Sequence, residues 1–128
     1  MTTTLITGGL GFLGSHLADH LLNRGERVVV IDDLSTGNAE NLAHHAHSTH
    51  LEILIDSILN EELMQQLVAR VDRVCHLAAA VGVGLVASDP VRVHETNTVG
   101  TSMVLKACAA RRRPVLLAST SEVYGKSS

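Results

Sequence analysis

Five short runs of aliphatic residues recur along the chain, and segments with helical character separate them. The runs are rich in Val, Ile and Leu and do not alternate with polar residues, which is typical of parallel strands buried on both faces. Strands that alternate with helices predict right-handed crossovers and a doubly wound parallel α/β sheet with strand order 3-2-1-4-5. The predicted strands are residues 4–7, 27–31, 51–55, 73–77 and 114–119.

Length and composition predict a single domain over residues 1–128. Hydrophobic residues make up 45% of the chain, but it holds one Phe, one Tyr and no Trp, so the core must be aliphatic.

A net charge of -3 argues against nucleic acid as a partner. No targeting segment or run of spanning length is found, so no membrane partner is expected. Cys75 and Cys108 lack metal or redox spacing, which predicts core positions and a cytoplasmic location.

Helices are expected between the strands. The first carries an apolar stripe and ends near Gly25, a residue suited to close a helix. The polar, histidine-rich segment 38–50 predicts only a short helix. Asn60 is a candidate N-cap for the next helix, and the longest helix is predicted over 90–111. The expected apolar faces consist of Leu13, Leu17 and Leu21 in the first helix and Leu63, Leu67 and Val68 after Asn60.

Three glycines follow the first strand and open the first helix. Gly8 can take the tight turn, Gly11 leaves room for a pyrophosphate against the backbone, and Gly14 allows the helix to pack closely on the sheet. Free backbone N–H groups at the start of that helix favour a negative charge. The position of the glycines between a strand and an amphipathic helix therefore indicates a dinucleotide-binding turn.

An acidic residue at the end of the second strand completes this pattern. Asp32 lies 24 residues beyond Gly8, where a carboxylate can accept hydrogen bonds from ribose hydroxyls and would repel a 2′-phosphate. No Lys or Arg follows until Arg70, so the sequence favours NAD over NADP. For Asp33, a cofactor contact and a solvated turn position remain equally open.

The spacing Gly8-x-x-Gly11-x-x-Gly14 resembles that of the extended short-chain dehydrogenase/reductase family of nucleotide-sugar epimerases, dehydratases and decarboxylases. Segment 32–38 is similar to the family's ribose-binding loop, and Asp56 to its adenine-binding Asp. Segment 76–79 resembles the part beneath the pyrophosphate, and Asn97 the Asn-x-x-Gly-Thr motif. This resemblance implies a Rossmann-like fold and an NAD site formed by Gly8, Gly11, Phe12, Leu13, Gly14, Asp32, Asp33, Ser35, Thr36, Gly37, Asn38, Asp56, Ser57, Leu77, Ala78, Ala79, Asn97 and Ser119.

The resemblance extends to residues 118–125, which are similar to the family's active-site strand. It implies that Thr120 hydrogen-bonds the sugar hydroxyl that is oxidised and that Glu122 is its acidic neighbour. The family oxidises the sugar transiently at C4 with NAD. The segment looks most like that of the UDP-glucuronate decarboxylases, although several epimerases share it.

The family's catalytic Tyr-x-x-x-Lys pair is not found in the chain. Tyr124 is followed by Lys126 after two residues rather than four. The resemblance implies that this pair and the sugar-binding part lie downstream, so the chain is expected to be truncated after its fifth strand, to bind NAD weakly and to be inactive alone. The alternative is a non-catalytic NAD-binding or interaction module derived from the family. Nucleotide sugar is expected as a partner only in a full-length form.

Three further expectations concern the histidines and the assembly of the chain. His44, His45, His47 and His50 show no helical i, i+4 pairing and no supporting carboxylates, so they predict a solvated segment without metal. His76 is expected to be a packed histidine. A bare strand edge and an apolar helix face after truncation predict a homo-oligomer.

Overall fold

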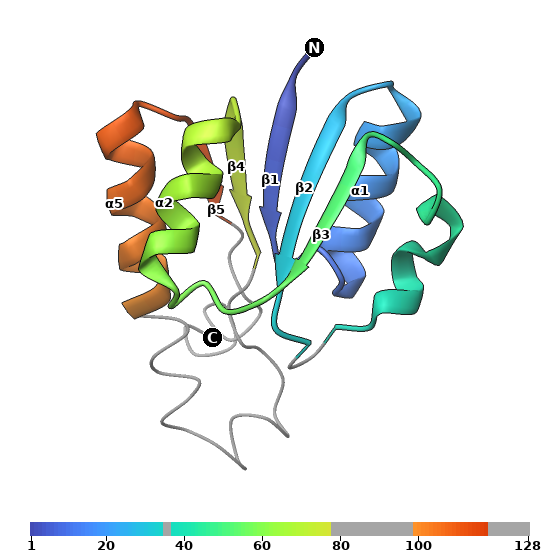
Figure 1. The fold of residues 1–128 in the computed structure, drawn as a ribbon, viewed down its shortest axis with the longest axis horizontal. Helices are drawn as coiled ribbons and strands as arrows, with labels where there is room; N and C mark the ends of the chain where they lie inside the picture. Colours follow the sequence, from blue (N-terminus) through green and yellow to red (C-terminus); the bar gives the residue numbers. More distant parts are fainter. Residues whose placement is uncertain (35–36, 78–98, 118–128) are drawn as a thin grey trace, which may run out of the picture.

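The structure is a computed structural model that describes residues 1–34, 37–77 and 99–117. It has five parallel strands in the order β3-β2-β1-β4-β5, which confirms the predicted sheet (Figure 1). The register pairs Thr7 with Ile31 of one neighbouring strand and with His76 of the other. The strands are β1 (Thr3–Thr7), β2 (Arg27–Asp32), β3 (Leu51–Ile55), β4 (Arg73–His76) and β5 (Val115–Leu117).

Helices cover both faces of the sheet. In the view of Figure 1, α2 lies in front of the sheet and α1 behind it. Two buried aliphatic clusters follow from this arrangement, one beneath α2 and α5 and the other beneath α1 and η1. The helices are α1 (Phe12–Asn23), the 3₁₀ helix η1 (Ala39–His45), α2 (Glu61–Arg70) and α5 (Thr101–Arg111).

The core is aliphatic, as the composition predicts. Leu5, Ile6 and Val30 are fully buried in the central strands. Cys75 and Cys108 are buried free thiols, which confirms their expected core positions. Burial raises the pKa of both thiols above its usual value. Both cysteines therefore act as small apolar core residues rather than as reactive groups.

Local sequence signals explain several helix ends. Gly25 has a φ of 82° and its N–H donates to Leu22 O, while Glu26 N donates to Leu21 O. These two bonds close α1 in a Schellman motif, as expected of a glycine at this position. Asn60 caps α2 by accepting a hydrogen bond from Leu63 N at 3.3 Å. Segment 38–50 forms only the short η1.

The predicted apolar faces need two corrections. Leu13 is 59% exposed because it lies in the first turn of α1, at the edge of the sheet. In α2, Met64 is buried and Leu63 only half-buried, so the apolar face is rotated by about one residue from the expected one. Of the predicted helix 90–111, residues 90–98 lie outside the described residues, and the described part runs from Thr101 to Arg111.

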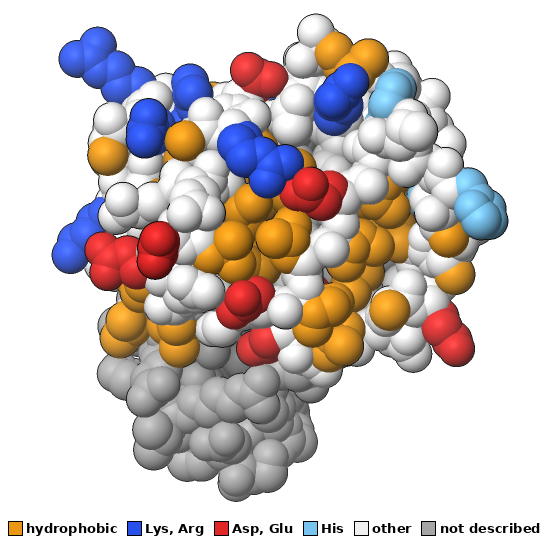
Figure 2. All heavy atoms as spheres, in the orientation of Figure 1, with side chains coloured by type: hydrophobic (Ala, Val, Ile, Leu, Met, Phe, Trp, Pro, Cys, Tyr) orange, Lys and Arg blue, Asp and Glu red, His pale blue; other side chains and the backbone are white. Residues whose placement is uncertain are grey.

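The surface on the α2 and α5 side mixes charges of both signs. Figure 2 shows acidic and basic side chains interspersed there, with apolar side chains between them. This face therefore has no continuous basic surface within the described part of the chain. Among the described residues, no helix is long and apolar enough to cross a membrane.

Candidate functional site

The candidate site lies at the carboxyl edge of the sheet, where β1 ends between β2 and β4. The chain direction after β1 is set by Gly8, whose φ of 73° favours glycine. Gly8 N donates to Ile31 O of β2 at 2.8 Å, and Gly11 N donates to Gly8 O at 3.1 Å. The turn is thus tied to the sheet before α1 begins. In open α/β sheets, such a switch point is the usual place for a ligand.

Close backbone packing in this turn depends on Gly9 and Gly14. A Cβ on Gly9 would lie 2.6 Å from both methyl groups of Val30 in β2. A Cβ on Gly14 would collide with the carbonyl oxygen of Gly8 and lie 2.8 Å from Gly9 Cα. Gly14 thus allows α1 to pack closely against the residues that directly follow β1, and Gly9 makes a second close contact, with β2 itself. The Gly8-Gly9 pair at the end of β1 was the signal for this second role.

The first turn of α1 has no side-chain cap. Gly11 is the N-cap residue, and there is no acidic residue in the first turn. The backbone N–H groups at a helix start have no partner within the helix, and with the helix dipole they attract anions. Among the described residues, a Cβ on Gly11 would meet only Gly8 O, at 3.4 Å, so none of them fills the space over Gly11. Phe12 is 79% exposed and, with the exposed Leu13, adds apolar surface beside this helix start.

Asp32 is a buried carboxylate that joins the glycine turn to the loop after β2. Its Oδ2 accepts a hydrogen bond from Leu10 N at 2.9 Å, and its Oδ1 accepts one from Leu34 N at 2.7 Å. A Cβ on Gly37 would lie 2.9 Å from Asp32 Oδ2, so only glycine allows this close approach of the loop. A carboxylate has about four lone-pair sites, and these two bonds leave acceptor capacity for a ligand hydroxyl.

Leu10 also anchors the start of η1. Its carbonyl oxygen accepts hydrogen bonds from Asn38 N at 3.0 Å and from Asn41 Nδ2 at 2.7 Å. The Asn38 side chain caps η1 by accepting a bond from Glu40 N at 2.9 Å. Sequence reasoning missed Asn41, whose only signal was a second Asn three residues after Asn38. These bonds fix residues 37 to 41 beside the glycine turn.

The end of β3 adds polar groups at the same edge. Asp56 N donates to Asp32 O at 3.2 Å, which places the two acidic residues side by side at the ends of the adjacent strands β2 and β3. Asp56 Oδ1 accepts a bond from Ser57 N at 2.7 Å, and Ser57 Oγ accepts one from Leu59 N at 3.0 Å. Asp56 is exposed. The site therefore continues from the glycine turn past Asp32 to the end of β3.

On the other side of β1, His76 joins β4 to β1 and α5. Its Nδ1 is 2.7 Å from Thr7 Oγ1, and its Nε2 is 2.9 Å from Thr101 Oγ1. Thr7 Oγ1 accepts a bond from Leu77 N at 2.9 Å. Burial lowers the pKa of His76 to about 4, so the ring is neutral at pH 7. His76 is thus the packed histidine that the sequence predicts, and it positions Leu77 and the start of α5.

The structure brings together the predicted site residues that it describes. Those at the carboxyl edge are Gly8, Gly11, Phe12, Leu13, Gly14, Asp32, Asp33, Gly37, Asn38, Asp56, Ser57 and Leu77. The remaining ones lie outside the described residues, and these are Ser35, Thr36, Ala78, Ala79, Asn97, Ser119, Thr120 and Glu122.

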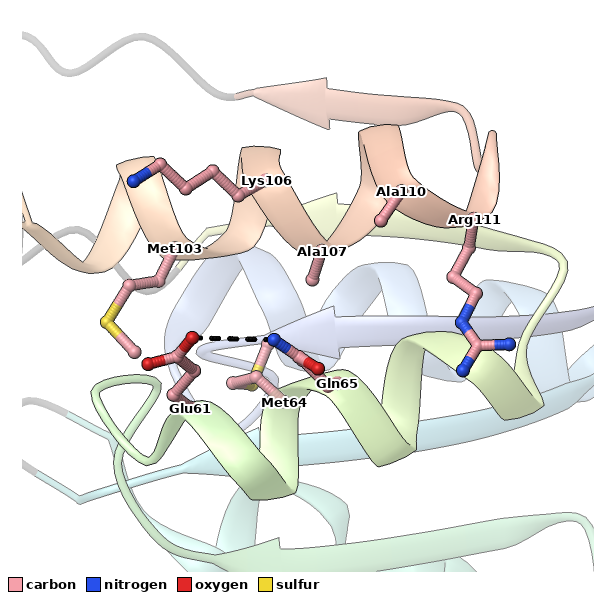
Figure 3. Close-up of a pocket in the computed structure, with 8 residues that line it drawn as sticks. All are labelled: Glu61, Met64, Gln65, Met103, Lys106, Ala107, Ala110 and Arg111. Atoms are coloured by element: carbon pink, nitrogen blue, oxygen red, sulfur yellow. Dashed lines mark hydrogen bonds between the residues drawn. The ribbon is translucent and has the colours of Figure 1, made fainter.

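A separate groove runs between α2 and α5 (Figure 3). Met64, Met103 and Ala107 give it an apolar floor, and Gln65 Nε2 donates to Glu61 Oε1 at 3.4 Å along one side. The groove contains neither the glycine turn nor Asp32 and lies on the opposite face from α1. It is therefore not part of the candidate site.

The order of the strands, the glycine turn and the buried acid define a Rossmann-like domain with a nucleotide-type turn at its switch point. Residues 5–128 match the family described as GDP-mannose 4,6 dehydratase. The chain belongs to this family.

Individual relatives come from the same group of enzymes. The chain is 42% identical to a UDP-N-acetyl-alpha-D-glucosaminuronate decarboxylase of Bacillus cytotoxicus over 95% of its own length and 37% of the relative. A UDP-glucose 4-epimerase of Thermotoga maritima, solved with UDP-glucose, superposes with a TM-score of 0.82 and 34% identity over 93% of this chain and 38% of that one. A UDP-glucose 4-epimerase of Brucella ovis in complex with NAD superposes with a TM-score of 0.81 and 30% identity. This match covers 98% of this chain and 38% of that one. The chain thus spans somewhat more than a third of the length of these proteins.

Proposed function

We propose that this chain is the NAD-binding portion of a nucleotide-sugar epimerase, dehydratase or decarboxylase that oxidises its sugar transiently at C4. The observation that carries the proposal is the pairing of an uncapped helix start at Gly11 with the buried carboxylate of Asp32, both fixed by Leu10. The decarboxylase and epimerase relatives support the same group of reactions.

The described residues divide the binding of NAD between them. The pyrophosphate would lie over Gly11, where the first-turn N–H groups of α1 donate to its oxygens. The adenosine ribose would donate its hydroxyls to Asp32, and Asp56 with Ser57 would border the adenine. Exposed Phe12 and Leu13 would become covered by the cofactor. These donors and acceptors fit a dinucleotide with two phosphates and free ribose hydroxyls.

The same residues argue for NAD rather than NADP. A 2′-phosphate would come close to the Asp32 carboxylate, and like charges at such a distance repel. Residues 28 to 69, which include the loops after β2 and β3, contain no Lys or Arg to offset that repulsion. The Brucella ovis relative, whose structure contains NAD, supports this choice.

Bound NAD supplies a hydride acceptor for C4 of the sugar. Thr120 and Glu122 are the residues that we propose to hold the reacting hydroxyl, on the basis of the resemblance of segment 118–125 to the family. The described residues His76 and Thr7 hold Leu77 at the end of β4. They would thereby set the position of the backbone that leads toward the nicotinamide end of the cofactor.

Calorimetric titration with NAD and with NADP tests the proposal. The unmodified chain is expected to bind NAD at least about tenfold more tightly than NADP, a difference of about 1.4 kcal/mol. Asp32→Ala is expected to abolish this preference by weakening NAD binding. Glu62→Gln, which removes one negative charge in the exposed first turn of α2, is the matched control and should bind NAD as the unmodified chain does.

Folding of each variant is checked by circular dichroism, because Asp32 also accepts two backbone hydrogen bonds. Equal affinity for both nucleotides in the unmodified chain would contradict the NAD assignment. Undetectable binding of either nucleotide by the folded chain would contradict the proposed function itself.

A further inference from the structure

Two histidines at the end of η1 converge on one carboxylate of α1. His45 Nε2 is 2.7 Å from Asp19 Oδ1, and His44 Nε2 is 2.9 Å from the same oxygen. The imidazole rings lie side by side, with their centroids 4.2 Å apart. All three potential ligand atoms lie within 4.8 Å of one another. The fold thus brings the Asp19 carboxylate together with two imidazoles that lie 25 and 26 residues after it in the sequence.

We propose that Asp19, His44 and His45 form a binding site for one divalent transition-metal ion such as Zn²⁺, which would link η1 to α1. Two imidazole nitrogens and one carboxylate oxygen are a common ligand set for Zn²⁺, with water in the fourth position. The sequence argument against a metal rested on the lack of an i, i+4 pairing and of supporting carboxylates near the histidines. The structure supplies that carboxylate from Asp19.

The geometry needs only small side-chain movements to accept the ion. With metal–ligand bonds of about 2.0–2.1 Å, tetrahedral ligand atoms are separated by about 3.3 Å. The present separations of 2.7 and 2.9 Å to Asp19 Oδ1 lie close to that value. The ion would replace the two hydrogen bonds, and each neutral imidazole would bind it through Nε2 while its one ring proton sits on Nδ1.

Exposure and charge also suit an open metal site. The side chains of His44 and Asp19 are 58% and 41% exposed, so an ion and its water can enter. The His45 side chain is only 14% exposed. The Asp19 carboxylate also brings a negative charge next to both imidazoles, which favours a cation at this place. Asn23 Nδ2 lies 3.4 Å from Asp19 Oδ2 and helps to orient the group.

The chain contains a competing pair that the test must exclude. His16 and His20 lie four residues apart on α1, a helical spacing that can also chelate a divalent ion, and both are exposed. His16→Gln removes this pair and leaves the proposed ligands intact. His47→Gln removes another exposed histidine of the segment after η1. These two variants are the matched controls.

Isothermal titration of the full chain, without a histidine tag, with ZnCl₂ tests the proposal. One equivalent of Zn²⁺ is expected to bind, and His45→Gln and Asp19→Asn are each expected to weaken binding by at least about tenfold. His16→Gln and His47→Gln should leave affinity and stoichiometry unchanged. Titration with CoCl₂ gives a second readout, because a site containing two imidazoles and a carboxylate shows visible absorption that the same two variants should lose.

Each outcome bears directly on the assignment. Loss of the Zn²⁺ equivalent in His16→Gln, or its persistence in both His45→Gln and Asp19→Asn, would overturn it. If His45→Gln does not fold, His44→Gln replaces it, because that side chain is largely exposed and its removal should spare the fold. A loss of the cobalt absorption in His44→Gln would then support the site, and an unchanged spectrum would overturn it.

Discussion

The backbone N–H of Leu10 donates to Oδ2 of Asp32 at 2.9 Å, and this bond joins the glycine turn to the end of β2. The carbonyl oxygen of the same Leu10 receives bonds from Asn38 and Asn41. The helix start that would bind phosphates and the carboxylate that would bind a ribose are therefore fixed relative to each other through one residue. Such pre-organisation reduces the ordering cost of binding a dinucleotide.

Gly11→Asp should change stability and cofactor affinity in opposite directions. Asp is a favoured N-cap whose charge suits a helix start, so stability should rise by a few tenths of a kcal/mol. The new carboxylate would lie at the proposed position of the pyrophosphate over Gly11 and repel it, so NAD affinity should fall by at least about tenfold. Urea unfolding and calorimetric titration measure the two effects. Gly11→Ala is the uncharged control, and unchanged NAD binding in Gly11→Asp would contradict the phosphate position.

Gly9→Ala tests the close contact between the turn and β2. The added methyl group would lie 2.6 Å from both methyl groups of Val30, so overpacking should cost about 1–3 kcal/mol of stability. In a Val30→Ala background those methyl groups are absent, and the same substitution should cost clearly less. Urea unfolding of the two single variants and the double variant measures the coupling. Strictly additive costs would show that the two side chains do not compete for this space.

The fold could be predicted from local patterns, because parallel strands buried on both faces leave continuous aliphatic runs. Gly25 and Asn60 likewise predicted helix ends. Gly25 closes a helix in a left-handed conformation and Asn60 caps one with its side chain, and both effects act within one helical turn. The glycine turn and Asp32 could also be predicted, because they lie in one consecutive strand–helix–strand unit and this unit determines their spacing in the sequence.

The parts that could not be predicted depend on contacts between elements. Asn41 bonds Leu10 across 31 residues, and Asp19 meets His44 and His45 only because η1 folds back onto α1. The exposure of Leu13 depends on where α1 starts relative to the sheet edge, which its apolar spacing does not encode. Periodicity describes one element at a time, and such contacts require the relative placement of two.

His76 should make stability depend on pH in the acid range. Its pKa in the folded state is about 4, below the usual value of 6.5, so the unfolded chain binds this proton more readily. Stability should therefore be constant above about pH 6.5 and fall toward pH 4 by about 3 kcal/mol in all from this residue. Urea unfolding across this range measures the slope. His76→Gln, which lacks the titrating ring, should show a flatter profile, and identical profiles would exclude His76 as the cause.

Self-association is expected through the β5 side of the sheet. Among the described residues, β5 pairs only with β4, and its Leu116 and Leu117 are 61% and 45% exposed. A strand edge with exposed apolar residues favours pairing with a second copy, and a lysine at such an edge opposes it. Sedimentation velocity at tens of micromolar should therefore show a dimer or larger species that Leu116→Lys converts to monomer. Gln66→Lys, at an exposed position of α2 away from both strand edges, is the matched control and should leave the assembly intact, whereas a monomeric unmodified chain would refute the expectation.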